Sequence, residues 1–191
     1  MQRSGWRWGG RIVDAEDISS TSDAAGPAAN PFGRLKSRIA DGEVDMVFLS
    51  ADGTGARHMR PYLGSSAAIY ATSMVNDARQ DAGANVDLRG IRFVDMPWMI
   101  QADHPAVMVY PRPVYARPEL QRFHALGIDA CLMADALMQG RNPIELDGVT
   151  GRLQLSIPGD GSGAAIQREP VMAIFADPAA APPATSESTP P

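Results

Sequence analysis

The longest regular pattern of apolar and polar positions lies in residues 118–140, PELQRFHALGIDACLMADALMQG, and it predicts one long helix. Pro118 suits the first helical turn because its missing N–H needs no partner there, and Gly140 suits the left-handed stop. One broad apolar face is predicted to be buried, and it consists of Leu120, Phe123, Leu126, Gly127, Ala130, Cys131, Met133, Ala134, Leu137 and Met138. Ile128 and Leu132 interrupt the opposite, polar side, so we expect them to contact a second surface.

The rest of the chain alternates shorter helical and extended patterns. Helices are predicted over 31–43, with Asn30 as N-cap, and over 52–64. Strands are predicted over 10–18, 44–51, 66–75, 90–100, 148–157 and 169–176, the last two forming a hairpin. This order predicts an α/β fold with a parallel sheet flanked by helices, in which the loops after the strands share one edge. The continuous apolar run at 44–51 is typical of a parallel strand covered on both faces.

Three segments are expected from these patterns. Residues 1–9 have no periodicity and are predicted to be irregular. Residues 10–176 contain all the predicted elements and form one folded region. Residues 177–191 hold five prolines and almost no apolar bulk, so we expect a disordered tail.

Composition narrows the class of protein. The chain has 191 residues, 45% of them apolar, which is enough for a core, and its net charge of −5 argues against a nucleic-acid surface. No run of 18 apolar residues occurs, and the N-terminus lacks the apolar stretch of a signal peptide. The protein is therefore expected to be cytosolic as written, or to be the C-terminal part of a longer exported chain. Cys131 is the single cysteine, which excludes an internal disulfide, and we expect it to be a small buried hydrophobe.

Candidate chemical groups are few. Asp52-Gly53-Thr54-Gly55 follows a strand and opens a helix, where free N–H groups could hold an anion. An ordinary turn is the favoured interpretation, because the glycine spacing of nucleotide-binding loops is absent. The histidines His58, His104 and His124 lack zinc-site spacing, and His124 is expected to be solvated.

The sequence also shows no pair of side chains suited to acid–base catalysis. Arg122 and Asp129 lie two turns apart on one side of the predicted helix, which favours a structural ion pair. No second carboxylate accompanies them, and the Gly-x-Ser-x-Gly pattern of hydrolases does not occur. The sequence therefore supplies no catalytic pair, no metal site and no cofactor motif.

Two segments near the C-terminus resemble those of a known protein family. RFHALGIDACLMADAL (122–137) and the segment 146–178 are similar to the end of a type I periplasmic-binding-protein domain. The matching positions are Gly148, Thr150, Gly151, Leu153 and Arg168. ALGIDA (125–130), DMVFLSA (45–51) and GIRFVDMPWM (90–99) resemble more particularly the C-terminal domain of the LppC family, the outer-membrane lipoprotein activators of penicillin-binding proteins. The likeness covers about residues 10–176.

The resemblance implies a protein that is not an enzyme and needs no cofactor. Family members are anchored by a lipid to the outer membrane, reach through the periplasm to a class A penicillin-binding protein, a peptidoglycan synthase, and stimulate transpeptidation. The lipidated cysteine, signal peptide, helical-repeat domain and first lobe of the family are not found in this sequence. We therefore expect an incomplete two-lobed domain, with Ile128 and Leu132 facing the absent lobe.

A second function shares this fold. A solute-binding protein for an amino-acid-like ligand would use hydroxyl groups at the strand ends, namely Ser50, Thr54, Thr72 and Ser73. The sequence leaves this alternative open.

Overall fold

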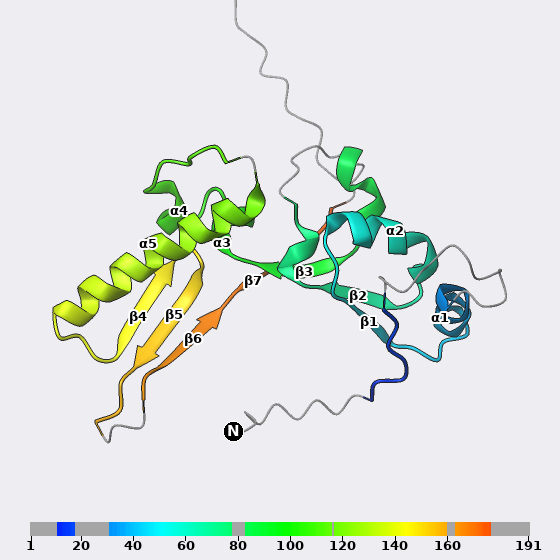
Figure 1. Cartoon of the computed structure of the whole chain (residues 1–191), viewed down its shortest axis with the longest axis horizontal. Coiled ribbons are helices and arrows are strands. Elements are labelled where there is room, and N and C mark those ends of the chain that lie inside the picture. Colours follow the sequence, from blue (N-terminus) through cyan, green and yellow to red (C-terminus); the bar gives the residue numbers. More distant parts are fainter. Residues whose placement is uncertain (1–10, 18–30, 78–82, 116, 160–162, 177–191) are drawn as a thin grey trace, which may run out of the picture.

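The computed structural model describes residues 11–17, 31–77, 83–115, 117–159 and 163–176. These residues form two lobes side by side, each built on its own β-sheet (Figure 1). The predicted α/β class with a parallel sheet flanked by helices is confirmed, and a second, antiparallel sheet accompanies it. Residues 1–9 and 177–191 lie outside the described residues, so the predicted division of the chain stays a prediction.

One of the two lobes, which we call the first lobe of this structure, contains a four-stranded sheet, which we call sheet A. Its strands are β1 (Met46–Leu49), β2 (Ala68–Ala71), β3 (Arg92–Asp95) and β7 (Val171–Ile174), in that spatial order. The first three are parallel, as predicted, and β7 returns from the end of the chain to pair antiparallel with β3. The carboxyl ends of β1, β2 and β3 therefore share one edge.

Two helices cover one face of sheet A. They are α1 (Pro31–Ala40) and α2 (Gly53–Leu63), both predicted, and two short 3₁₀ helices, η3 (Ser73–Val75) and η4 (Gly83–Leu88), follow β2. The core between helices and sheet contains Phe32, Ile39, Ala56, Met59, Leu63, Leu49, Ile69, Ala71 and Phe93, all nearly inaccessible to solvent. Asn30, the predicted N-cap of α1, lies outside the described residues.

The predicted strand at 10–18 is wrong in the part that is described. Residues 11–17 have no regular secondary structure. Their carboxylates attach them to α1 instead: Asp14 lies 2.6 Å from the guanidinium of Arg38, and Glu16 lies 4.0 Å from that of Arg34.

The second lobe contains an antiparallel sheet, which we call sheet B, formed by β4 (Ile144–Gly148), β5 (Gly151–Ser156) and β6 (Ala165–Glu169). The sequence patterns do not predict β4, which starts directly after Pro143. The predicted hairpin of 148–157 with 169–176 is also wrong. The strand that follows β5 and pairs with it is β6, and after Pro170 the next strand, β7, lies in sheet A.

The long helix α5 (Pro118–Met138) packs on sheet B, and both predicted ends are confirmed within two residues. Its buried face is Ala125, Asp129, Met133 and Ala136. Met133 is buried as predicted, but most of the predicted apolar face is wrong: Phe123 is 68% exposed and Met138 81%, and Cys131 is exposed as well. Apolarity misidentified the face because the true one contains small side chains and a carboxylate.

The described chain passes between the lobes at two places. The first follows β3 and leads into the short helices α3 (Pro97–Ile100) and α4 (Pro105–Met108); the second is Pro170, between β6 and β7. Residues 97–100 were predicted as strand and are helical, so the strand ends where the chain leaves sheet A. A third small core, of Trp98, Val107, Ala125 and Val149, holds this connection in the second lobe.

Candidate functional site: the junction between the lobes

Asp95, the last residue of β3, is the centre of a polar network between the lobes. Its side chain is only 1% exposed. The N–H of Met96 donates to its Oδ1 at 2.9 Å, and the side-chain amide of Asn76 donates to its Oδ2 at 3.0 Å. Arg122 of α5 completes the network from the other lobe, with Nη2 at 2.7 Å from Oδ2.

Arg122 also reaches the end of β2. The same Nη2 donates to the carbonyl oxygens of Ser73 and Asn76, both at 2.9 Å. One side chain of the second lobe thus satisfies three acceptor groups of the first, in a charge-assisted arrangement stronger than neutral hydrogen bonds. The predicted ion pair between Arg122 and Asp129 is wrong, because each residue has other partners.

Trp98 anchors the first connection in the second lobe. Its backbone N–H donates to the carbonyl of Val149 at 2.9 Å, and its indole N–H donates to Gln121 of α5 at 2.9 Å. The guanidinium of Arg112 lies 4.9 Å from the centre of the indole ring and donates to the carbonyl oxygen of Trp98. This fully buried indole therefore fixes both α3 and the proline-rich loop to α5.

His124 belongs to the same group. Its ring centre lies 5.4 Å from that of Trp98, and its Nδ1 lies 3.3 Å from the hydroxyl of Tyr115. The prediction of a solvated His124 is wrong, since the ring is half-buried between two aromatic side chains.

Asp129 fixes the turn between β4 and β5. Its carboxylate accepts hydrogen bonds from the N–H of Val149 at 3.0 Å, from the N–H of Thr150 at 2.8 Å and from the Thr150 hydroxyl at 2.6 Å. Asp129 and Thr150 are 2% and 1% exposed. A buried carboxylate with three donors is well satisfied, so its role is structural.

The two glycines of this turn are required by close approach. A Cβ on Gly148 would lie 2.5 Å from a carboxylate oxygen of Asp129, and a Cβ on Gly151 would overlap the carbonyl oxygen of Glu169. Gly151 also has φ +127°, which favours glycine. The turn therefore touches both connections: Val149 accepts from Trp98, and Gly151 abuts the end of β6. Arg168, which the resemblance also matched, is exposed and lies opposite the buried Leu153.

The four predicted hydroxyl residues all follow strands of sheet A. Ser50 and Thr54 are exposed after β1, while Thr72 and Ser73 are half-buried after β2. The hydroxyl oxygen of Thr72 is buried and has no hydrogen-bond partner among the described residues. Their common edge is as predicted, but nothing in the structure assigns them a ligand, and this site stays a prediction.

The turn at Asp52–Gly55 has an ordinary structural explanation. Asp52 is the N-cap of α2 and accepts from the N–H of Gly55 at 2.7 Å. A Cβ on Gly53 would lie 2.8 Å from the Asp77 carboxylate, which pairs with Arg57 at 2.9 Å. The carboxylates of the chain itself thus occupy this helix N-terminus.

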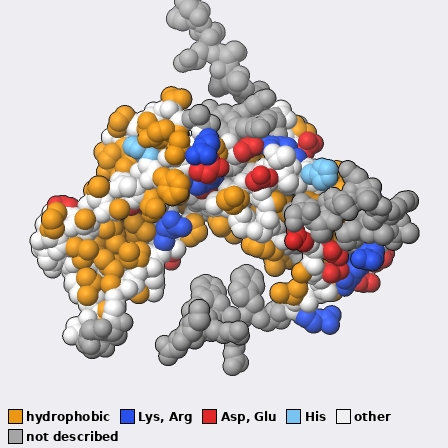
Figure 2. Space-filling view, viewed as in Figure 1, with side chains coloured by type: hydrophobic (Ala, Val, Ile, Leu, Met, Phe, Trp, Pro, Cys, Tyr) orange, Lys and Arg blue, Asp and Glu red, His pale blue; other side chains and the backbone are white. Residues whose placement is uncertain are grey.

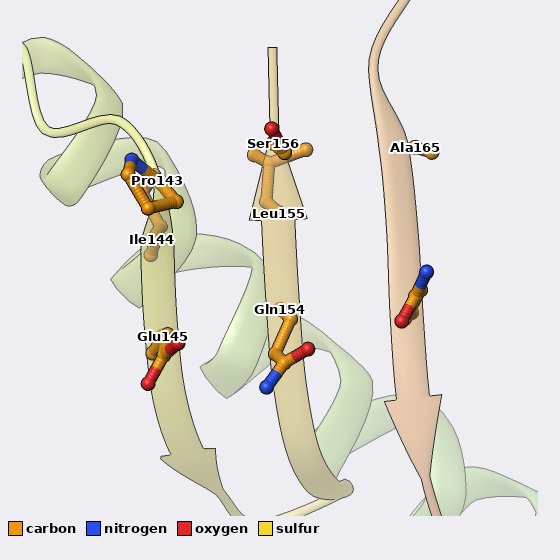
Figure 3. Close-up of a pocket in the computed structure, with 8 residues that line it drawn as sticks. Pro143, Ile144, Glu145, Gln154, Leu155, Ser156 and Ala165 are labelled. Atoms are coloured by element: carbon orange, nitrogen blue, oxygen red, sulfur yellow. The ribbon is translucent and has the colours of Figure 1, made fainter.

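Two surface hollows lie elsewhere in the second lobe. One of about 160 Å³ runs over β4, β5 and β6, between side chains such as Glu145, Gln154 and Ser156 (Figure 3). The other, of about 460 Å³, lies on the outer side of α5 and is lined by Tyr110, Phe123, His124, Gly127, Ile128, Cys131 and Leu132.

Ile128 and Leu132, the predicted inter-lobe contacts, both line the larger hollow. Ile128 packs against the Trp98 core of its own lobe, and Leu132 is 37% exposed. The contact that the structure does show between α5 and the first lobe is made by Arg122. A contact of Ile128 and Leu132 with a further part of the domain stays a prediction.

Within the described ranges, no three His, Cys, Asp or Glu side chains are placed to hold a metal ion. His58 is exposed on α2. No helix in the described part of the chain is long and apolar enough to cross a membrane.

Two α/β lobes joined by crossing segments, with a filled junction at the strand ends, define a periplasmic-binding-protein-like architecture. The comparison with family profiles is more particular. Residues 19–170 match the family described as "LppC putative lipoprotein", and the chain belongs to that family.

Curated relatives and solved structures are similar to this chain over part of their lengths. The chain is 28% identical over 129 residues to "Penicillin-binding protein activator LpoA" of Yersinia pseudotuberculosis, covering 63% of this chain but only 20% of the relative. A structure from Chromobacterium violaceum, described as "a putative branched-chain amino acid ABC transporter", has a TM-score of 0.61 and 34% identity over 76% of this chain and 46% of its own.

The C-domain of Haemophilus influenzae LpoA, described as "a regulator of PBP1A", has a TM-score of 0.57 over 78% of this chain and 48% of its own. At 20% identity, this likeness shows the fold alone. The chain spans about a fifth of the curated relatives and about half of these solved chains.

Proposed function

We propose that this chain acts as a non-enzymatic activator that binds a class A penicillin-binding protein, a peptidoglycan synthase, and stimulates its transpeptidation in cell-wall synthesis. Membership of the LppC family supports the proposal. So do the curated relatives, which are named as penicillin-binding protein activators, and a structural neighbour named as a regulator of PBP1A.

The position of Arg122 favours a protein partner over a small ligand. Ligands of open α/β sheets bind outside the carboxyl ends of the strands. At the ends of β2 and β3, Arg122 already bonds Ser73, Asn76 and the carboxylate of Asp95. A junction filled by the protein's own side chain favours a rigid scaffold that presents its outer surface to a partner.

The alternative is a solute-binding domain for an amino-acid-like ligand. It is favoured by the buried hydroxyl of Thr72, which has no partner among the described residues and stands at the same edge. The name of the Chromobacterium violaceum neighbour also points to amino-acid transport. In this case Ser50, Thr54 and Ser73 would join Thr72 in binding a carboxylate or ammonium group.

The same family membership supports a proposal for the localisation. We propose that the protein works in the periplasm and is held to the outer membrane by a lipid anchor. The family description as a lipoprotein supports this location.

Two measurements on the same preparation test the proposal. Binding of the chain to an immobilised class A synthase from its own bacterium is measured, together with calorimetry against branched-chain amino acids and muropeptides. We expect saturable binding to the synthase and no heat of binding with the small molecules. Tight small-molecule binding without synthase binding would support the solute-binding alternative instead.

A further inference from the structure

Residues 11–17, RIVDAED, form an acidic segment that lies against α1 and is attached to it by charge. The carboxylate of Asp14 lies 2.6 Å from the guanidinium of Arg38, and that of Glu16 lies 4.0 Å from the guanidinium of Arg34. We call residues 11–17 the acidic strap. Figure 2 shows acidic and basic side chains gathered together at the end of the first lobe where α1 lies (Figure 1).

The apolar side chains of the acidic strap contribute little to this contact. Ile12 is 86% exposed and Val13 38%, and the strap has no regular secondary structure. Ion pairs between solvent-accessible side chains are individually weak, and salt screens them over a Debye length of about 8 Å at physiological ionic strength. The acidic strap is therefore an occupant that a competing acidic group can displace.

Two arginine side chains form the surface beneath the strap. Arg34 and Arg38 are four residues apart, so they lie on the same side of α1, while Phe32 and Ile39 of the same helix are buried in the core. Glu43 holds the guanidinium of Arg38 from a second direction, with its carboxylate 2.9 Å from Nε. The side chain of Arg34 is 69% exposed, so most of its donors remain available to another carboxylate.

The spacing of the charges matches on the two sides of the contact. Four residues of an α-helix rise about 6 Å, and two residues of an extended chain span about 6–7 Å. Side chains at i and i+2 of an extended chain also point to the same side. Two carboxylates separated by one residue, as in Asp14-Ala15-Glu16, therefore form the pattern that two arginines at i and i+4 of a helix accommodate.

We propose that the side of α1 bearing Arg34 and Arg38 binds an extended acidic segment of a partner protein, and that the acidic strap occupies this surface until such a segment displaces it. The strap indicates the chemistry of the occupant, because it is an acidic segment seated on both arginines. It also precedes residues 19–170, which match the LppC family, so it is a feature of this chain outside the matched region.

The test adds a peptide of the strap sequence, RIVDAED with blocked ends, to the whole chain and follows the backbone amide signals of α1 by NMR. The native chain is compared with the strap variant Asp14→Asn, Glu16→Gln, in which the two side chains that reach the arginines are neutral. An occupied surface lowers the apparent affinity of a competitor in proportion to the fraction of molecules in which it is free. We expect the peptide to bind the strap variant at least about threefold more tightly than the native chain.

Two further variants complete the comparison. Asp45→Asn with Asp103→Asn changes the net charge by the same amount at two exposed positions, and it should leave the native affinity unchanged. Adding Arg34→Gln and Arg38→Gln to the strap variant should abolish the peptide-induced shifts in α1. A misfolded chain would not give the gain of affinity expected of the strap variant, and thermal unfolding checks the fold of every variant.

Equal affinities of the native chain and the strap variant would overturn the proposal, because the acidic strap would then cover no binding surface. Peptide binding that survives the loss of both arginines would also overturn it, since the site would lie elsewhere. The proposal would fail as well if inorganic sulfate produced the same shifts in α1 at the same concentration, because the surface would then be a general anion site.

Discussion

The guanidinium of Arg122, on the long helix of one lobe, lies 2.7 Å from the carboxylate of Asp95, at the end of a strand in the other lobe. The aspartate is almost fully buried and the arginine 17% exposed. Removing one member of such a pair leaves a buried charge without its partner. The pair therefore holds the two lobes in one orientation, and this property can be measured.

Replacement of Arg122 by alanine should lower the free energy of unfolding by about 3–5 kcal/mol. The loss arises because the buried carboxylate of Asp95 loses its strongest donor, and the carbonyls of Ser73 and Asn76 lose theirs. Urea unfolding followed by circular dichroism measures the difference.

Arg141→Ala is the matched control, because that side chain is exposed just after the same helix. Its effect should stay within about 0.5 kcal/mol. The double variant Arg122→Ala, Asp95→Asn should lose much less unfolding free energy than the sum of the losses of the two single variants. Additive losses would show that the two residues do not act as a pair.

Asp129→Asn should destabilise the protein by about 2–3 kcal/mol, because the new amide group would face the N–H groups of Val149 and Thr150. The control is Asp135→Asn, an exposed position on the same helix, for which little change is expected. Thermal unfolding compares the two variants. Equal effects would argue against a specific role of Asp129 in the turn.

Two glycine replacements should have opposite signs. Gly151→Ala should cost about 2–3 kcal/mol, because φ +127° and the carbonyl of Glu169 leave no room for a methyl group. Gly127→Ala should stabilise by about 0.5–1 kcal/mol, since Gly127 lies inside α5 with nothing within 4 Å of the added Cβ. Urea unfolding of both variants checks the signs, and a destabilised Gly127→Ala would contradict the packing of α5 described above.

The thiol of Cys131 should react with a water-soluble thiol reagent in the folded protein nearly as fast as in urea. The side chain is exposed on the outer side of α5. A buried thiol, as the sequence pattern predicted, would react at least about tenfold more slowly. The ratio of the two rates decides between these positions.

Local sequence patterns were enough to predict the ends of α5 and the positions of the three parallel strands, because these depend on neighbouring residues. The ends of α5 follow from Pro118 and Gly140, and the three parallel strands follow from their apolar runs. The buried side of α5 could not be predicted from apolarity, because Asp129 is accommodated there only by donors from a turn 20 residues away. The spacing of Asp129, four residues from both Ala125 and Met133, was the one signal in the sequence for the buried side.

The junction depends on long-range geometry. Arg122 and Asp95 are 27 positions apart and belong to different lobes, so no spacing rule connects them. The resemblance did mark Gly148, Thr150 and Gly151, but it gave no reason for them. The reason is the close packing of this turn against Asp129 and the end of β6.

The most direct test of the account is the fraction of cross-linked muropeptides that a class A synthase of the same bacterium produces from its lipid-linked precursor, with and without this chain. An activator of transpeptidation should raise that fraction in proportion to the chain added, up to saturation. An unchanged fraction at concentrations where the folded chain is bound to the synthase would contradict the proposed function.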